Sequence, residues 1–187
     1  MAPSPASPPL PPALPLTPWS GLAWRGHDPR WAHDPASGAG AAITGGRFNR
    51  PGQPTLYLAL GEGTAIREVQ AGFAHRFQPL TLCAYEVRGA RVADLRNHDV
   101  LAALGLGPGA PACAWRDDVD RGRVPDSWRL ADALRAAEAD GVLTPSYAGG
   151  ATSRDLNLVL WRWNAGGGAT VAIIDDFGRL PSPPPGA

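Results

Sequence analysis

The stretch that most constrains the fold is residues 45–68, in which a glycine-rich turn, a strand pattern and a helix pattern follow directly on one another. Over residues 55–60 three leucines alternate with Tyr57 and Ala59. Because successive side chains of a strand point to opposite faces, we expect the leucines on the buried face and Tyr57 on the other. The stretch therefore predicts a strand that directs one aromatic side chain away from the core.

The helix of this stretch follows a Gly-Glu-Gly turn and carries a carboxylate. Thr64 is expected to be its N-cap, and Ile66, Val69 and Phe73 are spaced by three and four as its buried stripe. Glu68 lies off this stripe, with small residues one turn away on each side. Small neighbours leave room for a ligand beside the carboxylate, whereas the spacing alone is more typical of a solvated glutamate.

The composition indicates one globular domain with many connections. A chain of 187 residues is long enough for a proper hydrophobic core. Its 23 glycines and 21 prolines together make up nearly twice the ordinary combined share of about 12 % of residues, so we expect a loop-rich domain. Lysine plus arginine equals aspartate plus glutamate at 17 each. No excess charge therefore favours direct nucleic-acid binding or an anionic membrane.

Several features predict a reduced cytoplasmic protein without a metal site. No apolar run approaches the roughly 18 residues of a transmembrane helix, and the N-terminus lacks the basic start of a signal peptide. Cys83 and Cys113 are too few for a disulfide framework. His27 and His33 lie in a loop and give no convincing zinc pattern, so we expect neither a metal nor a resident cofactor.

Proline-rich ends flank the expected domain, which spans residues 19–180. Residues 1–18 hold eight prolines, which remove backbone donors and favour an extended or disordered tail, and residues 181–187 form a second tail. Within the domain, further strands are predicted at 22–25, 80–87, 92–95, 142–144, 156–163 and 170–174, and helices at 97–104 and 128–139. Long loops are predicted at 26–44 and at 105–126, the latter with at most one helical turn around Trp115.

A known family signature resembles this sequence. The pattern Gly45-Gly46-Arg47-Phe48-Asn49-x-x-Gly-x-Pro-x-Leu56-Tyr57-Leu58-Ala59, followed by Thr64-Ala65-x-x-Glu68, is similar to the central motif of the RES domain. Weaker pieces occur in the same order, namely Trp24-Arg25, residues 37–41, Thr144-Pro145-Ser146 and Asn157-Leu158-Val159-Leu160, so the resemblance covers about residues 19 to 163.

Members of that family are the toxins of bacterial RES/Xre toxin–antitoxin pairs. The resemblance therefore implies NAD as the substrate and an Xre-type helix-turn-helix antitoxin as the partner. It also implies an ADP-ribosyltransferase-like fold. We accordingly expect an α+β domain with a split, mostly antiparallel central sheet and flanking helices.

Cleavage of the bond between nicotinamide and ribose sets the chemical requirement for such a protein. Nicotinamide leaves as a neutral molecule, and positive charge builds on the ribose as it does in glycoside hydrolysis. A fixed carboxylate near the ribose stabilises the transition state more than the ground state. The resemblance assigns this role to Glu68, since a glutamate typically binds the ribose 2′-hydroxyl in ADP-ribosyltransferase-like sites.

The other candidate residues take their roles from the same resemblance. Arg25 and Ser146 complete the catalytic set, and Ser146 is expected to orient the ligand or the glutamate rather than to act as a nucleophile. The expected substrate-binding residues are Arg47, Tyr57, Gly46 and Trp24. Planar guanidinium groups suit pyrophosphate or ribose hydroxyls, a tyrosine can stack on the nicotinamide ring, and a glycine lets the backbone approach a ligand. Each of these residue types also has an ordinary structural role on a surface, a turn or a core.

The predicted function is that of a toxin that depletes NAD by cleaving the nicotinamide–ribose bond, with water or phosphate as the acceptor. One alternative is a mono-ADP-ribosyltransferase that modifies a cellular protein. An alternative of another class is a non-catalytic nucleotide-binding module. The motif residues serve bond cleavage, which the hydrolytic, phosphorolytic and transferase reactions share, so they do not select the acceptor.

Overall fold

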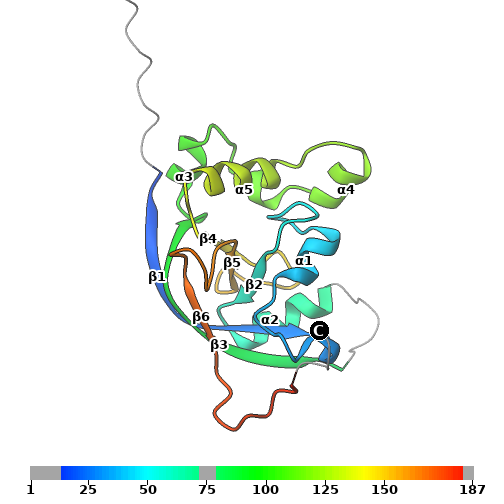
Figure 1. The fold of residues 1–187 in the computed structure, drawn as a ribbon. Helices are drawn as coiled ribbons and strands as arrows, with labels where there is room; N and C mark the ends of the chain where they lie inside the picture. The colour runs from blue at the N-terminus through cyan, green and yellow to red at the C-terminus, as the bar shows by residue number, and fades with distance from the viewer. Residues whose placement is uncertain (1–13, 72–78, 183–187) are drawn as a thin grey trace, which may run out of the picture.

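The computed structural model of the chain describes residues 14–71 and 79–182, which form a β-sheet wrapped on itself and flanked by short helices (Figure 1). The elements in chain order are β1 Leu16–His27, η1 Pro29–Trp31, α1 Ala39–Thr44, β2 Leu56–Ala59, α2 Glu62–Ala71, β3 Thr81–Asp94, α3 His98–Ala103, η2 Ala110–Ala112, α4 Trp115–Asp120, α5 Asp126–Ala136, β4 Gly141–Pro145, β5 Leu156–Leu160 and β6 Thr170–Ile173. Among the described residues, no helix has the length and apolar character needed to cross a membrane.

The sheet is a closed barrel rather than the split sheet that we expected. Its strand order is β1-β2-β5-β4-β3, and β3 pairs with β1 to close the ring, while β6 adds to β3 at its side. All pairings are antiparallel except that of β3 with β4, so the expectation of a mostly antiparallel sheet is confirmed. Closure is possible because β3 is long enough to bind β1 along its whole length and both β4 and β6 along its other edge.

The strand β1 begins earlier and ends later than the expected 22–25, and β3 joins two segments that were expected as separate strands. Leu16, Thr17 and Pro18, placed in the N-terminal tail above, pair with Ala93, Val92 and Arg91 of β3. The expected segments 80–87 and 92–95 are parts of one strand, β3. Between Trp19 and Gly21 of β1 the pairing shifts register, and this bulge accommodates Gly89 of β3, whose φ is 67°. Such a bulge bends a strand, and Figure 1 shows β1 and β3 curving together around the barrel.

The barrel separates two hydrophobic cores. Inside it, the leucines of β2 and β5 pack with β3 side chains; this core includes Leu56, Leu58, Tyr85, Val87, Leu158 and Leu160. Outside it, α3 and α5 pack against the outward side chains of β4 and β5; this second core includes Val100, Leu130, Leu134, Val142, Val159 and Trp161. The predicted alternation is confirmed over 55–60 and 156–161, although β5 ends at Leu160 and Trp163 packs against the inner core. On the outer face, Tyr57, Thr144 and Asn157 line a pocket, whereas Val142 is buried under the helices.

Some helix details differ from the sequence interpretation. The helix α2 begins at Glu62, and Thr64 does not cap it, because its hydroxyl donates to Asp155 Oδ1 at 2.6 Å. Ile66 and Val69 are only half-buried, whereas Thr64 and Ala65 form the buried side. The third residue of the expected stripe, Phe73, lies outside the described residues. In the expected loop 105–126, the turns of η2 and α4 are helical.

Gly141 provides a test of the barrel packing. A Cβ atom at Gly141 would lie against the carbonyl oxygen of Val159 on the paired strand. We expect Gly141→Ala to destabilise the protein by about 1–3 kcal/mol, a fall in melting temperature of roughly 2–4 °C per kcal/mol for a chain of this size. Gly107→Ala is the matched control, since a Cβ there meets nothing within 4 Å. Equal melting temperatures for both variants, measured by circular dichroism, would contradict the packing described here.

Candidate functional site

A cleft lies on the outer face of the barrel, where β2, β5 and β4 meet α2 and α4. It consists of a larger pocket of about 430 Å³ and a smaller pocket of about 250 Å³. Both pockets are lined by Tyr57, Glu68 and Asn157, so these three side chains stand at the junction. The predicted residues Arg47 and Gly46 line the larger pocket, and Trp24 and Arg25 line the smaller one.

The carboxylate of Glu68 is fixed through one of its two oxygens. Ser146 Oγ donates to Oε1 at 2.6 Å, and Asn157 Nδ2 donates to the same oxygen at 2.5 Å. Within the described part of the chain, Oε2 receives no hydrogen bond. The carboxylate is therefore held in place with one oxygen left for a ligand, and it is not the freely solvated glutamate that the spacing alone suggested.

Ser146 occupies the position expected of a residue that orients the glutamate. It directly follows β4 and is buried, with 8 % of its surface exposed. Its main-chain nitrogen donates to Asp155 O at 2.7 Å, and its hydroxyl also accepts from Ala148 N at 3.3 Å. These contacts fix the hydroxyl that binds Glu68, while a part for Ser146 in catalysis stays a prediction.

Asn157 is the main site residue to which the sequence analysis gave no role. It lies on β5 opposite Ala59 of β2 and Thr144 of β4, on the outer face of the barrel. Its Oδ1 is buried and has no hydrogen-bond partner among the described residues. The signal was present in the sequence, because the alternation of β5 placed Asn157 opposite the leucines and on the same side as Val159.

The two arginines are anchored in the same way on opposite sides of the junction. Arg25 Nη1 donates to Pro35 O at 3.1 Å and to Ser37 O at 2.8 Å. Arg47 Nη1 donates to the carbonyl oxygens of η2 and the residue after it, Pro111 at 3.1 Å and Cys113 at 2.7 Å. One terminal nitrogen of each guanidinium is thus bound to the main chain, and each arginine lines one pocket.

Neither arginine is neutralised by a carboxylate. No ion pair within 4.0 Å involves Arg25 or Arg47 in residues 14–71 and 79–182. Burial lowers the pKa of both guanidinium groups, yet arginine remains charged at neutral pH. Each pocket therefore contains a partly buried positive charge, which favours an anionic ligand.

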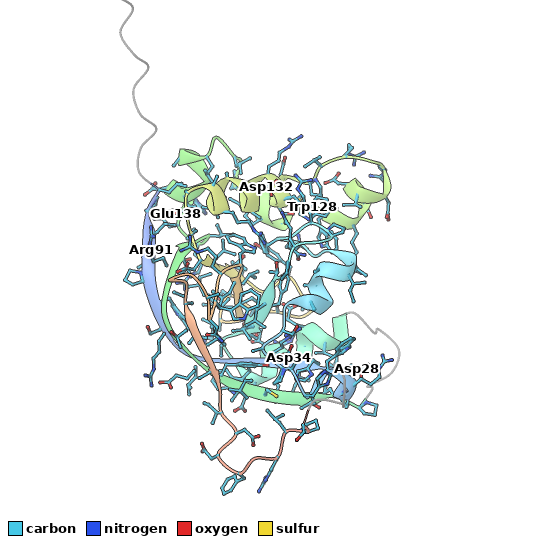
Figure 2. The ribbon with its side chains drawn as sticks, viewed as in Figure 1. Asp28, Asp34, Arg91, Trp128, Asp132 and Glu138 are labelled. Atoms are coloured by element: carbon cyan, nitrogen blue, oxygen red, sulfur yellow. The ribbon has the colours of Figure 1, made fainter. Side chains whose placement is uncertain are left out.

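Tyr57 and Gly46 form one packed unit at the floor of the larger pocket. Tyr57 Oη donates to Asn49 Oδ1 at 2.8 Å and accepts from Phe48 N at 3.0 Å. A Cβ atom at Gly46 would lie 2.6 Å from Tyr57 Oη, so only glycine permits this approach. Trp128 lies on α5 (Figure 2), and its Nε1 donates to Gly46 O at 2.8 Å. Gly46 thus serves the turn itself, and the ring of Tyr57 still lines both pockets.

A further wall of the larger pocket comes from a region that the sequence identified only as a loop. Trp115, Arg116 and Asp117 at the start of α4 line this pocket. Tyr147 lines the same pocket, and the guanidinium carbon of Arg47 lies 4.4 Å from the centre of its ring. The glycines and prolines around α4 carry no periodic pattern, so no local pattern indicated that this segment lines the same pocket as Glu68.

Comparison with known proteins places these features in a family. The family model described as the RES domain matches residues 22–182. Among solved structures, a chain of the crystal structure of the M. tuberculosis MbcT–MbcA toxin–antitoxin complex is similar, with a TM-score of 0.59 and 27 % sequence identity. The match covers 78 % of this chain and 75 % of that chain. None of the curated proteins compared with this chain matches it.

The tyrosines give a test of how closely the cleft and the core are packed. Burial raises the pKa of Tyr57, Tyr85 and Tyr147, the three tyrosines of the chain. We expect the folded protein to show no phenolate near pH 10, where unfolded tyrosines ionise. Above that pH the unfolded state binds fewer protons, so stability falls as the pH rises through the unfolded value of about 10. Ultraviolet absorbance titration checks this against the protein in denaturant, and a tyrosine that ionises near pH 10 in the folded protein would contradict it.

Proposed function

This chain belongs to the RES domain family, and we propose that it is the toxin of a toxin–antitoxin pair and cleaves NAD at the nicotinamide–ribose bond. The observation that carries the proposal is the position of Glu68. Its carboxylate is fixed at the junction of two pockets, each of which contains an arginine without a carboxylate partner. This arrangement suits a long ligand that carries negative charge and is attacked near its middle.

NAD has the chemical features that such a cleft requires. Its pyrophosphate is anionic, and planar guanidinium groups such as those of Arg25 and Arg47 bind phosphate oxygens with two parallel hydrogen bonds. Its nicotinamide–ribose bond lies beside ribose hydroxyls, which can donate to the unoccupied Oε2 of Glu68. As the bond breaks, positive charge develops on the ribose, and a nearby fixed carboxylate stabilises that charge without having to reorganise.

The contacts of Glu68 support a role as an electrostatic stabiliser. Ser146 and Asn157 both donate to Oε1, so the carboxylate cannot rotate freely when the substrate arrives. Preorganisation of this kind is a major source of rate acceleration in enzymes. Tyr57 is available to stack on a flat ring because its hydroxyl is held by Asn49 and Phe48 while its ring lines both pockets.

For the acceptor we propose water or phosphate. A small molecule can reach Glu68 within pockets of about 430 and 250 Å³. The positive charges of Arg25 and Arg47 would also attract a phosphate ion. Transfer of ADP-ribose to a protein would instead require a side chain of that protein to enter the cleft.

The partner that we propose is an Xre-type helix-turn-helix antitoxin acting in the cytoplasm. This proposal is supported by the family resemblance and by the similar M. tuberculosis chain, whose structure was solved as a toxin–antitoxin complex. We also propose that the barrel is a variant of the ADP-ribosyltransferase fold, a relation that rests on the RES resemblance and on the glutamate in the cleft. Co-purification with the product of the adjacent gene tests the partner directly.

The proposed role of Glu68 predicts a large effect of a small change. Glu68→Gln keeps the shape of the side chain and removes its charge. We expect NAD turnover, measured as nicotinamide release, to fall about a hundred- to a thousandfold, because one preorganised electrostatic group is worth about 2.7–4 kcal/mol. Expression of the wild-type chain should arrest growth, and expression of the Gln variant should not.

Glu62→Gln is the matched control for this experiment. Glu62 lies on the same helix but is exposed, and it lines neither pocket. Unchanged turnover in Glu68→Gln would remove Glu68 from the mechanism. Growth arrest that persists in Glu68→Gln, with NAD turnover lost, would show that NAD cleavage is not the cause of toxicity.

The proposed role of Arg47 predicts a change in substrate binding. Arg47→Ala should raise KM for NAD roughly ten- to a hundredfold, since hydrogen bonds to charged groups contribute about 1.5–3 kcal/mol. Arg47→Lys should raise it less, because lysine keeps the charge but loses the planar fork. Steady-state kinetics of both variants, with Arg88→Ala on the exposed side of β3 as the control, measure this difference. An unchanged KM in Arg47→Ala would leave Arg47 with only its contacts to η2 and Tyr147.

A further inference from the structure

Asp155, the last residue before β5, joins the segments that carry the candidate site. Its side chain is 13 % exposed. Oδ1 accepts from Thr64 Oγ1 and from Arg67 Nη1, both on α2 and both at 2.6 Å. Oδ2 accepts from the main-chain nitrogen of Thr152 at 2.7 Å and from its hydroxyl at 2.8 Å. One carboxylate therefore ties α2 to the loop that precedes β5.

The main chain of Asp155 extends this link to the donors of Glu68. Its carbonyl oxygen accepts from Ser146 N at 2.7 Å, which holds the two ends of the 146–155 loop together. Two residues further along β5 is Asn157. Asp155 is thus connected to Glu68 and to both donors of Glu68 Oε1. The link to Glu68 runs through α2, the link to Ser146 is a backbone hydrogen bond, and the link to Asn157 runs along the chain into β5.

The helix geometry explains why the α2 contacts of Asp155 matter for Glu68. Thr64 and Glu68 are four residues apart, so they lie one above the other on the same face of α2. Thr64 binds Asp155, the residue directly before β5, and Glu68 binds Asn157 within that strand. Two successive turns of α2 are therefore hydrogen-bonded to residues 155–157, and these two contacts fix the distance between α2 and β5.

We propose that Asp155 is a positioning residue, which holds α2 at the distance from β4 and β5 that keeps Glu68 Oε1 bound to Ser146 and Asn157. This inference rests on the proposed function of Glu68. Asp155 lines neither pocket, so it acts through its neighbours and needs no contact with substrate.

The electrostatics of Asp155 favour such a role. Donors from Thr64 and Thr152, with the charge of Arg67, hold the pKa of the Asp155 carboxyl well below its usual range, so it is charged at any neutral pH. A charged acceptor makes short, strong hydrogen bonds that resist rotation of the side chain. Asp155 also binds the guanidinium of Arg67, the sequence neighbour of Glu68, and so compensates a positive charge that would otherwise be free beside the catalytic carboxylate.

Three substitutions test the proposal in the full-length protein. Asp155→Asn removes the charge and replaces one acceptor oxygen by a donor, and Thr64→Val removes one bond from α2 while keeping the shape of the side chain. In both we expect kcat for NAD to fall by about ten- to a hundredfold, since a small misplacement of a catalytic group can cost about a hundredfold. KM should change by less than about threefold, because the arginines that bind the phosphates are untouched. Thr64→Ser keeps the hydroxyl and should retain wild-type kcat.

Asp94→Asn is the matched control, because Asp94 is also a partly exposed carboxylate with several donors, all of them from Arg96. It should keep wild-type kinetics. In a Glu68→Gln background, Asp155→Asn should cause little further loss, since a residue that acts through Glu68 has nothing left to position. Equal fold-losses of kcat in the two backgrounds would overturn the proposal and assign Asp155 a general structural role.

Nuclear magnetic resonance separates this inference from the proposed function. The side-chain amide of Asn157 donates to Glu68, so its resonances should shift in Asp155→Asn and in Thr64→Val but not in Asp94→Asn. If the wild-type protein consumes no NAD, the proposed function fails, and this measurement still decides the structural claim. Unchanged Asn157 side-chain resonances in Asp155→Asn would overturn the positioning role.

Discussion

The pairing of β1 with β3 is the interaction on which the rest of the structure depends. The two strands remain paired from Leu16 opposite Ala93 to His27 opposite Thr81, with one bulge on the way. Because the other edge of β3 binds β4, this pairing closes five strands into a ring and leaves none of them with a fully open edge. Closure also gives every strand an inner and an outer face. The inner faces are filled mainly by apolar side chains, while Tyr57, Thr144 and Asn157 on the outer face line a pocket.

The cleft uses this outer face as a rigid floor and takes its walls from distant parts of the chain. Strands β2 and β5 supply Tyr57 and Asn157, and α2 supplies the carboxylate between them. Two arginines of the cleft bind main-chain carbonyl groups of neighbouring segments. Arg25 binds those of Pro35 and Ser37, and Arg47 binds those of Pro111 and Cys113, directly before the pocket-lining residues 114–117. The same arginines line the two pockets and provide positive charge there.

The sequence predicted the parts of this arrangement that depend on local pattern. Strict alternation identified β2 and β5 and the faces of their side chains, and the family resemblance brought Arg25, Arg47, Tyr57, Glu68 and Ser146 to one place, where the structure also finds them. What the sequence could not predict depends on pairing between distant segments. Barrel closure needed a strand that begins among prolines at Leu16, and Thr64 has the pattern of a helix cap but binds Asp155, which is distant in sequence. The wall formed by α4 has no apolar periodicity at all.

The close approach of Gly46 to Tyr57 has a consequence for how relatives of this chain can vary. A methyl group at position 46 would meet both Tyr57 Oη at 2.6 Å and Asn49 Oδ1 at 2.7 Å, and these two side chains are hydrogen-bonded to each other. A change at only one of the three positions therefore leaves either a clash or an unpaired polar atom. In an alignment of homologues, positions 46, 49 and 57 should change together or not at all, so they behave as a single inherited unit.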